Sequence, residues 1–147
     1  MTPCAEELLT LFNAARSAIG APSLSFNLLL NRAARKHSSY MLQSGQFSHI
    51  GENRSSFAER ISNAGYFYRN AAENIAFCPP VSKRVYQIWK NSPPHWQNIL
   101  NPDFVHMGIA VAPESVMKSR DNHYWTLKLA APLKFENLAE APLGQFA

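Results

Sequence analysis

The chain has 147 residues, of which 46% are hydrophobic and 16% are charged. This composition is typical of one globular domain with a buried core, and it excludes a disordered chain. The formal net charge is +4, but the basic residues are dispersed along the chain, so we expect no nucleic-acid partner. No apolar run approaches the roughly 20 residues that a membrane-spanning helix needs, so we expect no transmembrane segment.

Four stretches have the apolar spacing of an amphipathic helix, namely residues 5–19, 27–44, 56–64 and 82–91. Gly20 and Gly45 follow the first two stretches, at the place where glycine commonly ends a helix. Ser56 and Glu59 match a capping box at the start of the third stretch. The first two-thirds of the chain are therefore predicted to be mainly helical.

The last third of the chain changes to strand-like spacing. Ser92 is predicted to cap a helix of one to two turns, because a proline follows it at the first helical position. Beyond that helix, apolar residues alternate with polar ones over 104–112 and 123–129, which is typical of strands. A polar hairpin loop over 113–122 joins these two strands, and a further aromatic-rich strand is predicted near 66–77.

This order of elements indicates an α+β fold in which helices pack on a small antiparallel sheet. We expect one domain over residues 1–131 and a C-terminal tail over 132–147 that packs on it or trails from it. Cys4 and Cys78 are the only cysteines, too few for a disulfide framework and wrongly spaced for a zinc knuckle. Two free thiols and one disulfide both remain open from the sequence.

Three polar side chains, His49, Glu73 and His95, are unusual for a purely structural domain. Glu73 lies in an apolar run, and in a strand it would be partly desolvated and would need partners. His95 lies near a helix N-terminus, where the dipole disfavours the protonated ring and leaves an imidazole able to bind metal. Two imidazoles and one carboxylate would suit zinc or another divalent cation. Their separation along the chain equally allows three unrelated, locally hydrogen-bonded groups.

The remaining histidines receive structural interpretations. His37 lies on the apolar face of its predicted helix, so we expect a hydrogen-bonded core residue. His106 alternates with apolar neighbours and faces away from them, which favours a solvated position over one that lines a cleft. His123 begins a strand and is expected to be exposed.

Five motifs occur in the order expected of the CAP superfamily, also called SCP-like or cysteine-rich secretory, antigen 5 and pathogenesis-related-1. They are FSH ending at His49, AENIA from Ala72, WKNSPPHWQNILNP from Trp89, MGIAV from Met107 and YWT from Tyr124. The chain resembles the bacterial single-domain branch of this superfamily over about residues 6–131.

The resemblance implies an α-β-α sandwich with a cleft that holds two histidines and two acids, and zinc bound through the histidines in some members. It assigns the two histidine positions to His49 and His95 and one acid position to Glu73. Zinc or another divalent cation is the implied cofactor, with His49 and His95 as its ligands. Members outside the bacterial branch carry the second acid, a glutamate, shortly after the tryptophan that matches Trp89, but this chain reads KNS there. Ser92, the last of these three, is interpreted as a helix cap rather than a catalytic group.

Two functions are compatible with these residues. We favour an exported binding module for a divalent metal, for a small apolar or lipid-like ligand, or for a cell-surface component. The alternative is a metal-assisted hydrolase of peptide or cell-wall material, in which His49 and His95 hold zinc and Glu73 is the general base. The missing second acid weighs against that alternative. Further candidates for the ligand cleft are Ser92, Trp96 and Asn74.

Export is also an expectation from the resemblance. Members of the superfamily are typically exported, which implies an extracellular or periplasmic protein. The first residues, MTPCAEE, lack the basic and then apolar layout of a secretory signal. We therefore expect a mature or trimmed form if this protein is exported.

Overall fold

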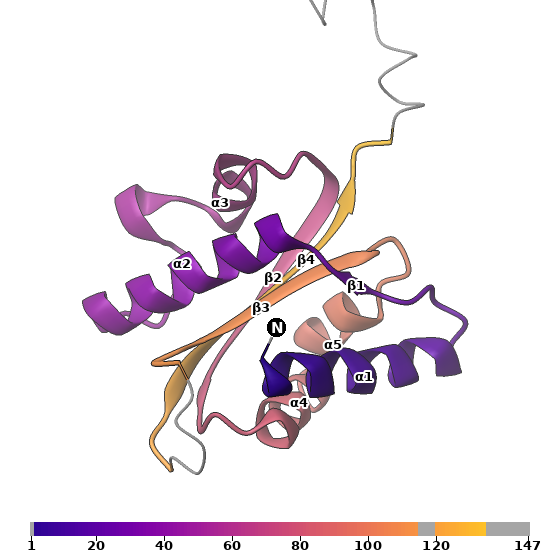
Figure 1. Ribbon diagram of the computed structural model, residues 1–147, viewed down its shortest axis with the longest axis horizontal. Coiled ribbons are helices and arrows are strands. Elements are labelled where there is room, and N and C mark those ends of the chain that lie inside the picture. The colour runs from indigo at the N-terminus through magenta and orange to yellow at the C-terminus, as the bar shows by residue number, and fades with distance from the viewer. Residues whose placement is uncertain (1, 115–119, 135–147) are drawn as a thin grey trace, which may run out of the picture.

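A computed structural model describes residues 2–114 and 120–134 of the chain. The elements in chain order are α1 (Pro3–Ala18), β1 (Ser25–Phe26), α2 (Leu28–Ser44), the 3-10 helix η1 (Glu52–Arg54), α3 (Phe57–Asn63), β2 (Tyr68–Cys78), α4 (Ser82–Lys90), α5 (Pro93–Leu100), β3 (His106–Ala112) and β4 (His123–Pro132). The sheet lies between two layers of helices, with α2 and α3 on one face and α1, α4 and α5 on the other (Figure 1). The predicted α+β fold is confirmed, and its layering is the α-β-α sandwich that the resemblance implied.

The helices form where their spacing predicts them, and local signals fix their ends. The side chain of Asn27 caps α2 by accepting hydrogen bonds from two backbone N–H groups, at 2.9 and 3.1 Å. Gly45 ends α2 with a φ of 71°, which only glycine adopts readily. The Ser56 hydroxyl accepts from the N–H of Glu59 at 3.1 Å, which is one half of the predicted capping box.

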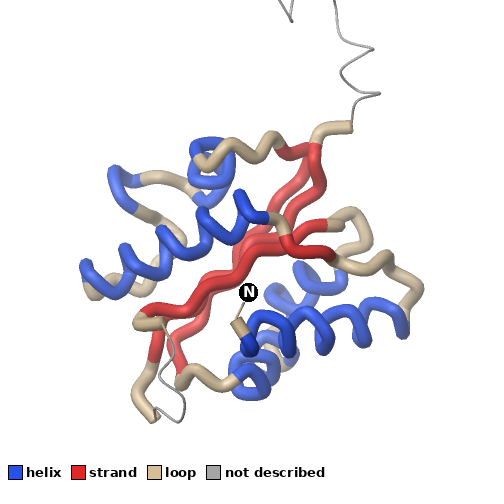
Figure 2. The backbone as a smooth tube through the Cα atoms, in the orientation of Figure 1, coloured by secondary structure: helices blue, strands red, loops and turns tan. Residues whose placement is uncertain are grey.

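The strand order in the sheet is β1-β3-β4-β2. β3 and β4 are antiparallel neighbours, as the predicted hairpin requires, and residues 115–119 of its loop lie outside the described part. β1 pairs in parallel with β3 through two residues only, so the sheet is mixed rather than purely antiparallel as predicted. A strand of two residues is too short to show alternation in the sequence. β2 pairs with β4 and forms one edge of the sheet. The strands run through the middle of the molecule, with helices on either side (Figure 2).

The two faces of the sheet differ in polarity. Toward α1 and α4, the buried side chains of Phe12, Trp89 and Trp125 belong to one large apolar cluster. Toward α2 and α3, a smaller apolar cluster includes Leu30 and Ile61. Buried polar side chains lie beside that smaller cluster, on the same face of the sheet. This second face therefore carries the groups from which a site can be built.

Helix α2 lies against the backbone of β3 at Gly108. A Cβ atom at this position would lie 2.2 Å from both the backbone nitrogen of Asn31 and the carbonyl carbon of Leu30. The side-chain oxygen of Asn31 also accepts a hydrogen bond from the N–H of Ile109 at 3.1 Å. The glycine thus permits the close contact between helix and strand.

One arginine is buried on the opposite side of the sheet. Arg16 of α1 is fully buried, and burial lowers the pKa of its guanidinium. Its nitrogens donate at 2.7–2.9 Å to the backbone carbonyls of Pro22, Ile99, Asn101 and Phe104. This side chain consequently ties α1 to the end of α5 and to the turn that leads into β3.

Two histidines differ from their predictions. His123 is buried, and its Nδ1 lies 2.8 Å from the carbonyl of Pro113. The prediction of exposure is wrong because β4 pairs with β2 from its first residue, which places His123 opposite Cys78 inside the sheet. His106 is half-buried and lies 2.8 Å from the Tyr66 hydroxyl, so it is bonded to protein rather than simply solvated.

Cys4 and Cys78 are free thiols. Strand β4 continues to Pro132, one residue beyond the predicted domain boundary, while most of the predicted tail, residues 135–147, lies outside the described part.

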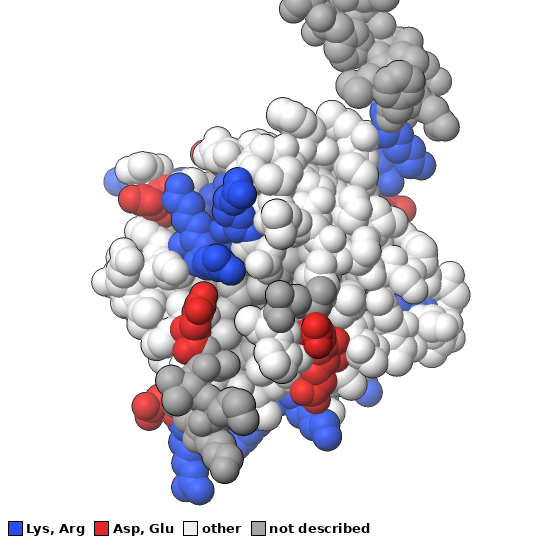
Figure 3. All heavy atoms as spheres, in the orientation of Figure 1, with Lys and Arg blue, Asp and Glu red and all other residues white. Residues whose placement is uncertain are grey.

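None of the described helices is long and apolar enough to cross a bilayer. On the face shown in Figure 3, basic side chains gather over α2 with acidic ones close by.

Candidate functional site

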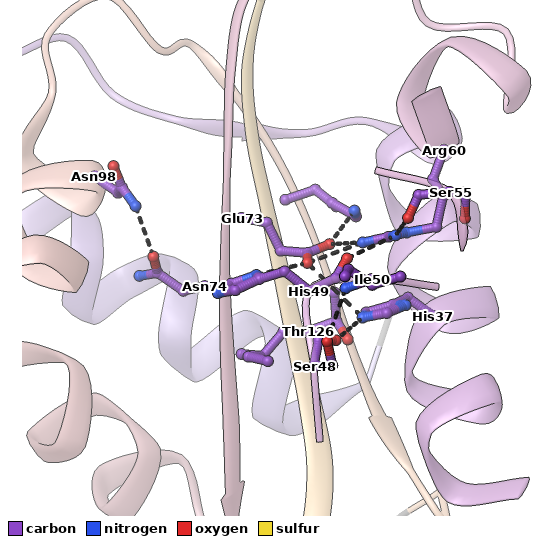
Figure 4. A network of polar contacts seen from close by, with 12 residues as sticks. His37, Ser48, His49, Ile50, Ser55, Arg60, Glu73, Asn74, Asn98 and Thr126 are labelled. Atoms are coloured by element: carbon purple, nitrogen blue, oxygen red, sulfur yellow. Dashed lines mark hydrogen bonds and ion pairs between the residues drawn. The ribbon is translucent and has the colours of Figure 1, made fainter. Parts of the chain in front are cut away.

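Glu73 is the centre of a buried polar network on the side of the sheet that faces α2 and α3 (Figure 4). Nη2 of Arg60 donates to both of its carboxylate oxygens, at 2.9 and 2.7 Å, and Nζ of Lys128 donates to Oε2. Nδ1 of His49 donates to Oε1 at 2.9 Å. The expectation that a carboxylate in this strand needs polar partners is therefore confirmed.

Two buried cations share this one carboxylate. Burial alone raises the pKa of Glu73, but the hydrogen bond from His49 and the charges of Lys128 and Arg60 outweigh it and lower the pKa to about 2. Burial lowers the pKa of Lys128 to about 8, an effect that Glu73 partly offsets. At neutral pH the carboxylate is ionised and both cations are charged. The two oxygens of Glu73 accept hydrogen bonds from three side chains, those of Arg60, Lys128 and His49.

His49 is held by its ring and by its backbone. Its side chain is 51% exposed, and because Nδ1 is bound to Glu73, Nε2 is the ring nitrogen left for a ligand. Its carbonyl accepts from Nη1 of Arg60 at 2.9 Å. The carbonyl of Ser48 accepts from Nε2 of His37 at 2.8 Å, so His37 is the hydrogen-bonded core residue that was predicted. Two buried side chains thus fix the loop that carries His49.

His95 lies in the first turn of α5 and is anchored in a similar way. Its Nδ1 is 2.7 Å from the Ser92 hydroxyl, and its carbonyl accepts from the Asn74 side chain at 3.0 Å. The side-chain oxygen of Asn74 in turn accepts from Asn98 at 2.9 Å. Burial and the neighbouring His49 lower the pKa of His95, which favours its neutral ring. Its Nε2 has no hydrogen-bond partner among the described residues.

The Ser92 side chain forms a hydrogen bond with the ring of His95 and does not cap the helix. It occupies the N-cap position of α5, as predicted, but its side chain makes no capping hydrogen bond. The next two residues, Pro93 and Pro94, have no N–H group to offer. The hydroxyl is consequently available to the ring of His95.

The two histidines come from opposite layers of the sandwich and meet at the edge strand β2. Adjacent residues in a strand point to opposite faces of the sheet. Glu73 therefore reaches the ring of His49 on one face, and Asn74 reaches the backbone of His95 on the other. The consecutive pair Glu73 and Asn74 accounts for how residues distant in the sequence come together.

His49 and His95 could offer two imidazoles to a metal ion, but not a complete set of protein ligands. Among residues 2–114 and 120–134, no group of three or more His, Cys, Asp and Glu side chains could hold a metal. Histidines that bind metal usually have their other ring nitrogen anchored by a carboxylate or a similar group, and His49 and His95 both fit this pattern. Glu73 does not fit as a third ligand, because Arg60 and Lys128 already bind its oxygens.

Sequence reasoning missed Arg60 and Lys128. Lys128 gives a weak signal, since it is a charged residue in an apolar strand and pairs directly with Glu73 in the register of β4 and β2. Arg60 gives none, because a charged residue in a short helix is ordinarily on the surface. Trp96, a further candidate for the ligand cleft, packs edge-to-face against Tyr86 with ring centroids 5.7 Å apart.

The chain is similar to known proteins over most of its length. A family model described as the cysteine-rich secretory protein family, CAP, matches residues 9–129. The uncharacterized protein YkwD of Bacillus subtilis is 33% identical over 104 residues, which are 71% of this chain and 40% of that protein. The uncharacterized membrane protein YlbC of the same organism is 28% identical over 110 residues, or 75% of this chain and 32% of that protein. The chain thus spans less than half the length of these curated relatives.

Solved structures share the fold. An extracellular protein containing an SCP domain from Bacillus anthracis has a TM-score of 0.75 at 25% identity, covering 86% of this chain and 39% of that one. An outer surface protein from Borrelia burgdorferi has a TM-score of 0.77, covering 88% of this chain and 93% of its own. The identity with the second protein is 15%, so this likeness concerns the fold alone.

Proposed function

Because the chain belongs to the cysteine-rich secretory protein (CAP) family, whose model matches residues 9–129, we propose that it is a binding module that presents His49 and His95 to a divalent cation. The observation that carries this proposal is the matching anchorage of the two rings. Each has its Nδ1 bonded to a partner, Glu73 or Ser92, and its Nε2 left over. Zinc is the cation that such imidazoles suit best, with water or a bound ligand completing its coordination.

The state of Glu73 supports binding over hydrolysis. A general base must hold a free lone pair within reach of the water that it activates. The Glu73 carboxylate instead accepts hydrogen bonds from Arg60, Lys128 and His49, and its pKa is about 2, far below the operating pH of a useful base. The position shortly after Trp89, where superfamily members outside the bacterial branch have a second acid, also lacks a carboxylate. Glu73 therefore acts as an anchor for His49.

Exposed aromatic rings beside His49 support a small apolar or lipid-like ligand. Phe47 is 52% exposed and Phe77 is 44% exposed, and their ring centroids lie 6.3 Å apart. Tyr124 continues this row, with its ring centroid 4.6 Å from that of Phe77. Ile50, which follows His49, is 60% exposed. An apolar molecule on this row would lie next to the loop that carries His49. We also propose an extracellular or periplasmic location, since the related SCP-domain protein of Bacillus anthracis is described as extracellular.

Zinc titration of the purified protein by calorimetry tests the proposal. We expect one binding site in the unaltered chain, and at least a tenfold loss of affinity in His49→Ala and in His95→Ala, since each removes one of two protein ligands. His106→Ala is the matched control, because His106 is bonded to Tyr66 away from the cleft. If neither cleft variant changes zinc affinity, the proposed site is wrong. Hydrolysis of peptides or peptidoglycan that a chelator abolishes would instead favour the enzyme.

A further inference from the structure

The outer edge of β3 is only partly covered by β1. The two strands pair through two residues each, Ser25 and Phe26 opposite His106 and Met107. β1 is the last strand on this side of the sheet, and the chain then turns into α2. β3 itself runs on to Ala112. In the described part of the chain, the last residues of β3 therefore have a strand neighbour on one side only, which is β4.

The hydrogen bonds of β3 show which backbone groups point toward its open edge. The Met107 carbonyl accepts from the N–H of Asn27 at 2.9 Å, on the side of β1. The N–H of Ile109 donates to the side-chain oxygen of Asn31 at 3.1 Å. Backbone groups alternate between the two sides of a strand, so the carbonyl of Ile109 and both backbone groups of Val111 also point to the open edge. These three groups have no hydrogen-bond partner among residues 2–114 and 120–134.

A cavity of about 460 Å³ lies at this open edge, within the range of about 300–1,000 Å³ for ligand sites. Its walls come from β3, the end of β1, the start of α1 and the first half of α2. Because α1 and α2 cover opposite faces of the sheet (Figure 1), a cavity lined by both lies beside the strand. Ala110 and Val111 line it and are half-buried, so a ligand can reach the edge. His49 and His95 are not in its lining, which makes it independent of the proposed cation site.

The two walls of the cavity differ in polarity. Trp125 and Val111 belong to or pack against the large apolar cluster on the side of α1. Asn31 and Arg35 line the cavity from α2. The charge of Arg35 is matched by Glu114, the other charged residue of the lining, at 3.9 Å. The cavity therefore favours an uncharged ligand that is apolar toward α1 and polar toward α2.

An extended peptide fits both the edge and the walls. Its backbone carries donors and acceptors at the spacing of a strand edge, and its side chains alternate between two faces. A purely apolar molecule would leave the backbone groups of Val111 without partners, which is costly. We propose that the open edge of β3 binds an uncharged, extended segment of another protein as an added strand, in the manner of other sheets that recognise peptides by their edges.

The backbone amide resonance of Val111 tests this proposal directly. The probe is the peptide Ac-Thr-Val-Thr-Val-Thr-NH2, which alternates polar and apolar side chains and is titrated at millimolar concentrations. We expect a saturable downfield shift of the Val111 amide proton and slower hydrogen exchange there, with no comparable shift at His49 or His95. The variant His49→Ala should bind the peptide equally well, so failure of the cation site and failure of this site are distinguishable. The absence of a saturable shift at Val111 would overturn the proposal.

Methylation of the peptide nitrogens separates backbone pairing from contact through side chains alone. Alternate N–H groups of an added strand point toward β3. One peptide is therefore methylated at its two valines and another at its threonines. One of these two sets should weaken binding at least tenfold, and the other by less than twofold. Equal effects of the two sets would contradict strand addition.

A pair of variants at position 111 provides the matching measurement on the protein. Val111→Pro removes the N–H group from the edge, where proline is tolerated because that group has no partner in the sheet, and should weaken peptide binding at least tenfold. Val111→Thr is the control, since it keeps the N–H group and the branched shape, and should bind within about twofold of the unaltered protein. Near-ultraviolet circular dichroism shows whether both variants are folded. Unchanged binding in a folded Val111→Pro would contradict the assignment, and if that variant does not fold, the methylated peptides decide.

A second copy of this chain is the competing occupant of the edge. Analytical ultracentrifugation without peptide should show a monomer, and the Val111 amide shift should not depend on protein concentration. A dimer that Val111→Pro dissociates would show that β3 pairs with its own copy, and it would overturn the assignment to a segment of another protein.

Discussion

Replacing Glu73 with glutamine should remove a large part of the protein's stability, because two buried cations would lose their counter-charge. The amide has nearly the same size and planar shape as the carboxylate, so packing changes little. The side chain of Lys128 is 0% exposed and that of Arg60 is 8% exposed, so water cannot replace the lost interaction. The two positive charges would then repel each other in a medium of low dielectric.

The size of the effect follows from this geometry. Removing one partner from a buried ion pair costs about 3–5 kcal/mol. Since one carboxylate here serves both Arg60 and Lys128, we expect the upper part of that range at pH 7. A typical domain unfolds with about 5–15 kcal/mol, so the loss is a third or more of the total. The melting temperature should fall by roughly 10–15 °C for a chain of this length.

Urea unfolding at pH 7, followed by the fluorescence of the buried Trp89 and Trp125, measures the loss. Raising the pH to about 9.5 should reduce it. Lys128 in the folded variant, with no carboxylate beside it, releases its proton below the unfolded value of about 10.5, so the free energy of unfolding rises with pH there. The double variant Glu73→Gln/Lys128→Met should be more stable than the single one. Glu52→Gln is the control, as Glu52 is exposed, and should change stability by less than about 0.5 kcal/mol.

Two outcomes would refute the reasoning. One is a loss below about 1 kcal/mol, which is the ordinary effect of a single substitution. The other is a double variant that is less stable than Glu73→Gln, since the repulsion between the cations would then not be the cause.

Three further predictions concern other parts of the fold. Burial lowers the folded pKa of His37 to about 4, so the unfolded chain takes up the proton first, and stability should fall by up to about 3 kcal/mol as the pH drops from 6.5 to 4. Urea midpoints across that range in the unaltered protein and in His37→Phe check this, since the variant should lose the share of His37 and keep only that of other groups, such as His95, whose pKa is also lowered. Arg16→Met should destabilise by more than about 3 kcal/mol, since four carbonyls lose their donor, and hydrogen exchange should accelerate over residues 99–105. Gly108→Ala should prevent α2 from packing on β3, because the new Cβ would lie 2.2 Å from backbone atoms, and a melting temperature within a few degrees of the original would contradict this.

The regular elements could be predicted because their signals are local. The spacing of apolar residues, the cap at Asn27 and the glycine at position 45 act within a few residues, and the helices and longer strands form where these signals lie. β1 could not be predicted, because Ser25 and Phe26 alone show no alternation. Its place beside β3 is decided by tertiary packing.

The candidate site could be predicted only in part. The apolar surroundings of Glu73 indicate that it needs partners, but the sequence does not say which cations supply them. Lys128 becomes a partner through the register of two strands, and Arg60 through the packing of a short helix against the sheet. Ser92 has the sequence signature of a cap, yet the prolines after it turn its hydroxyl toward His95. Such roles depend on distances that sequence spacing does not encode.

Glu73 and Asn74 are adjacent on the edge strand, so their contacts depend on the register of β2 against β4. The side-chain period of a strand is 2, so sliding β2 by one residue against β4 exchanges the faces of the whole strand. The acid would then point toward α5 and the amide toward Lys128, so the ring of His49 would lose its hydrogen bond to Glu73 and the backbone of His95 would lose its hydrogen bond to Asn74. This arrangement around Glu73 and Asn74 thus exists in only one alignment of the strand pair, and a misaligned chain would lack the proposed cation site even if its helices and strands formed.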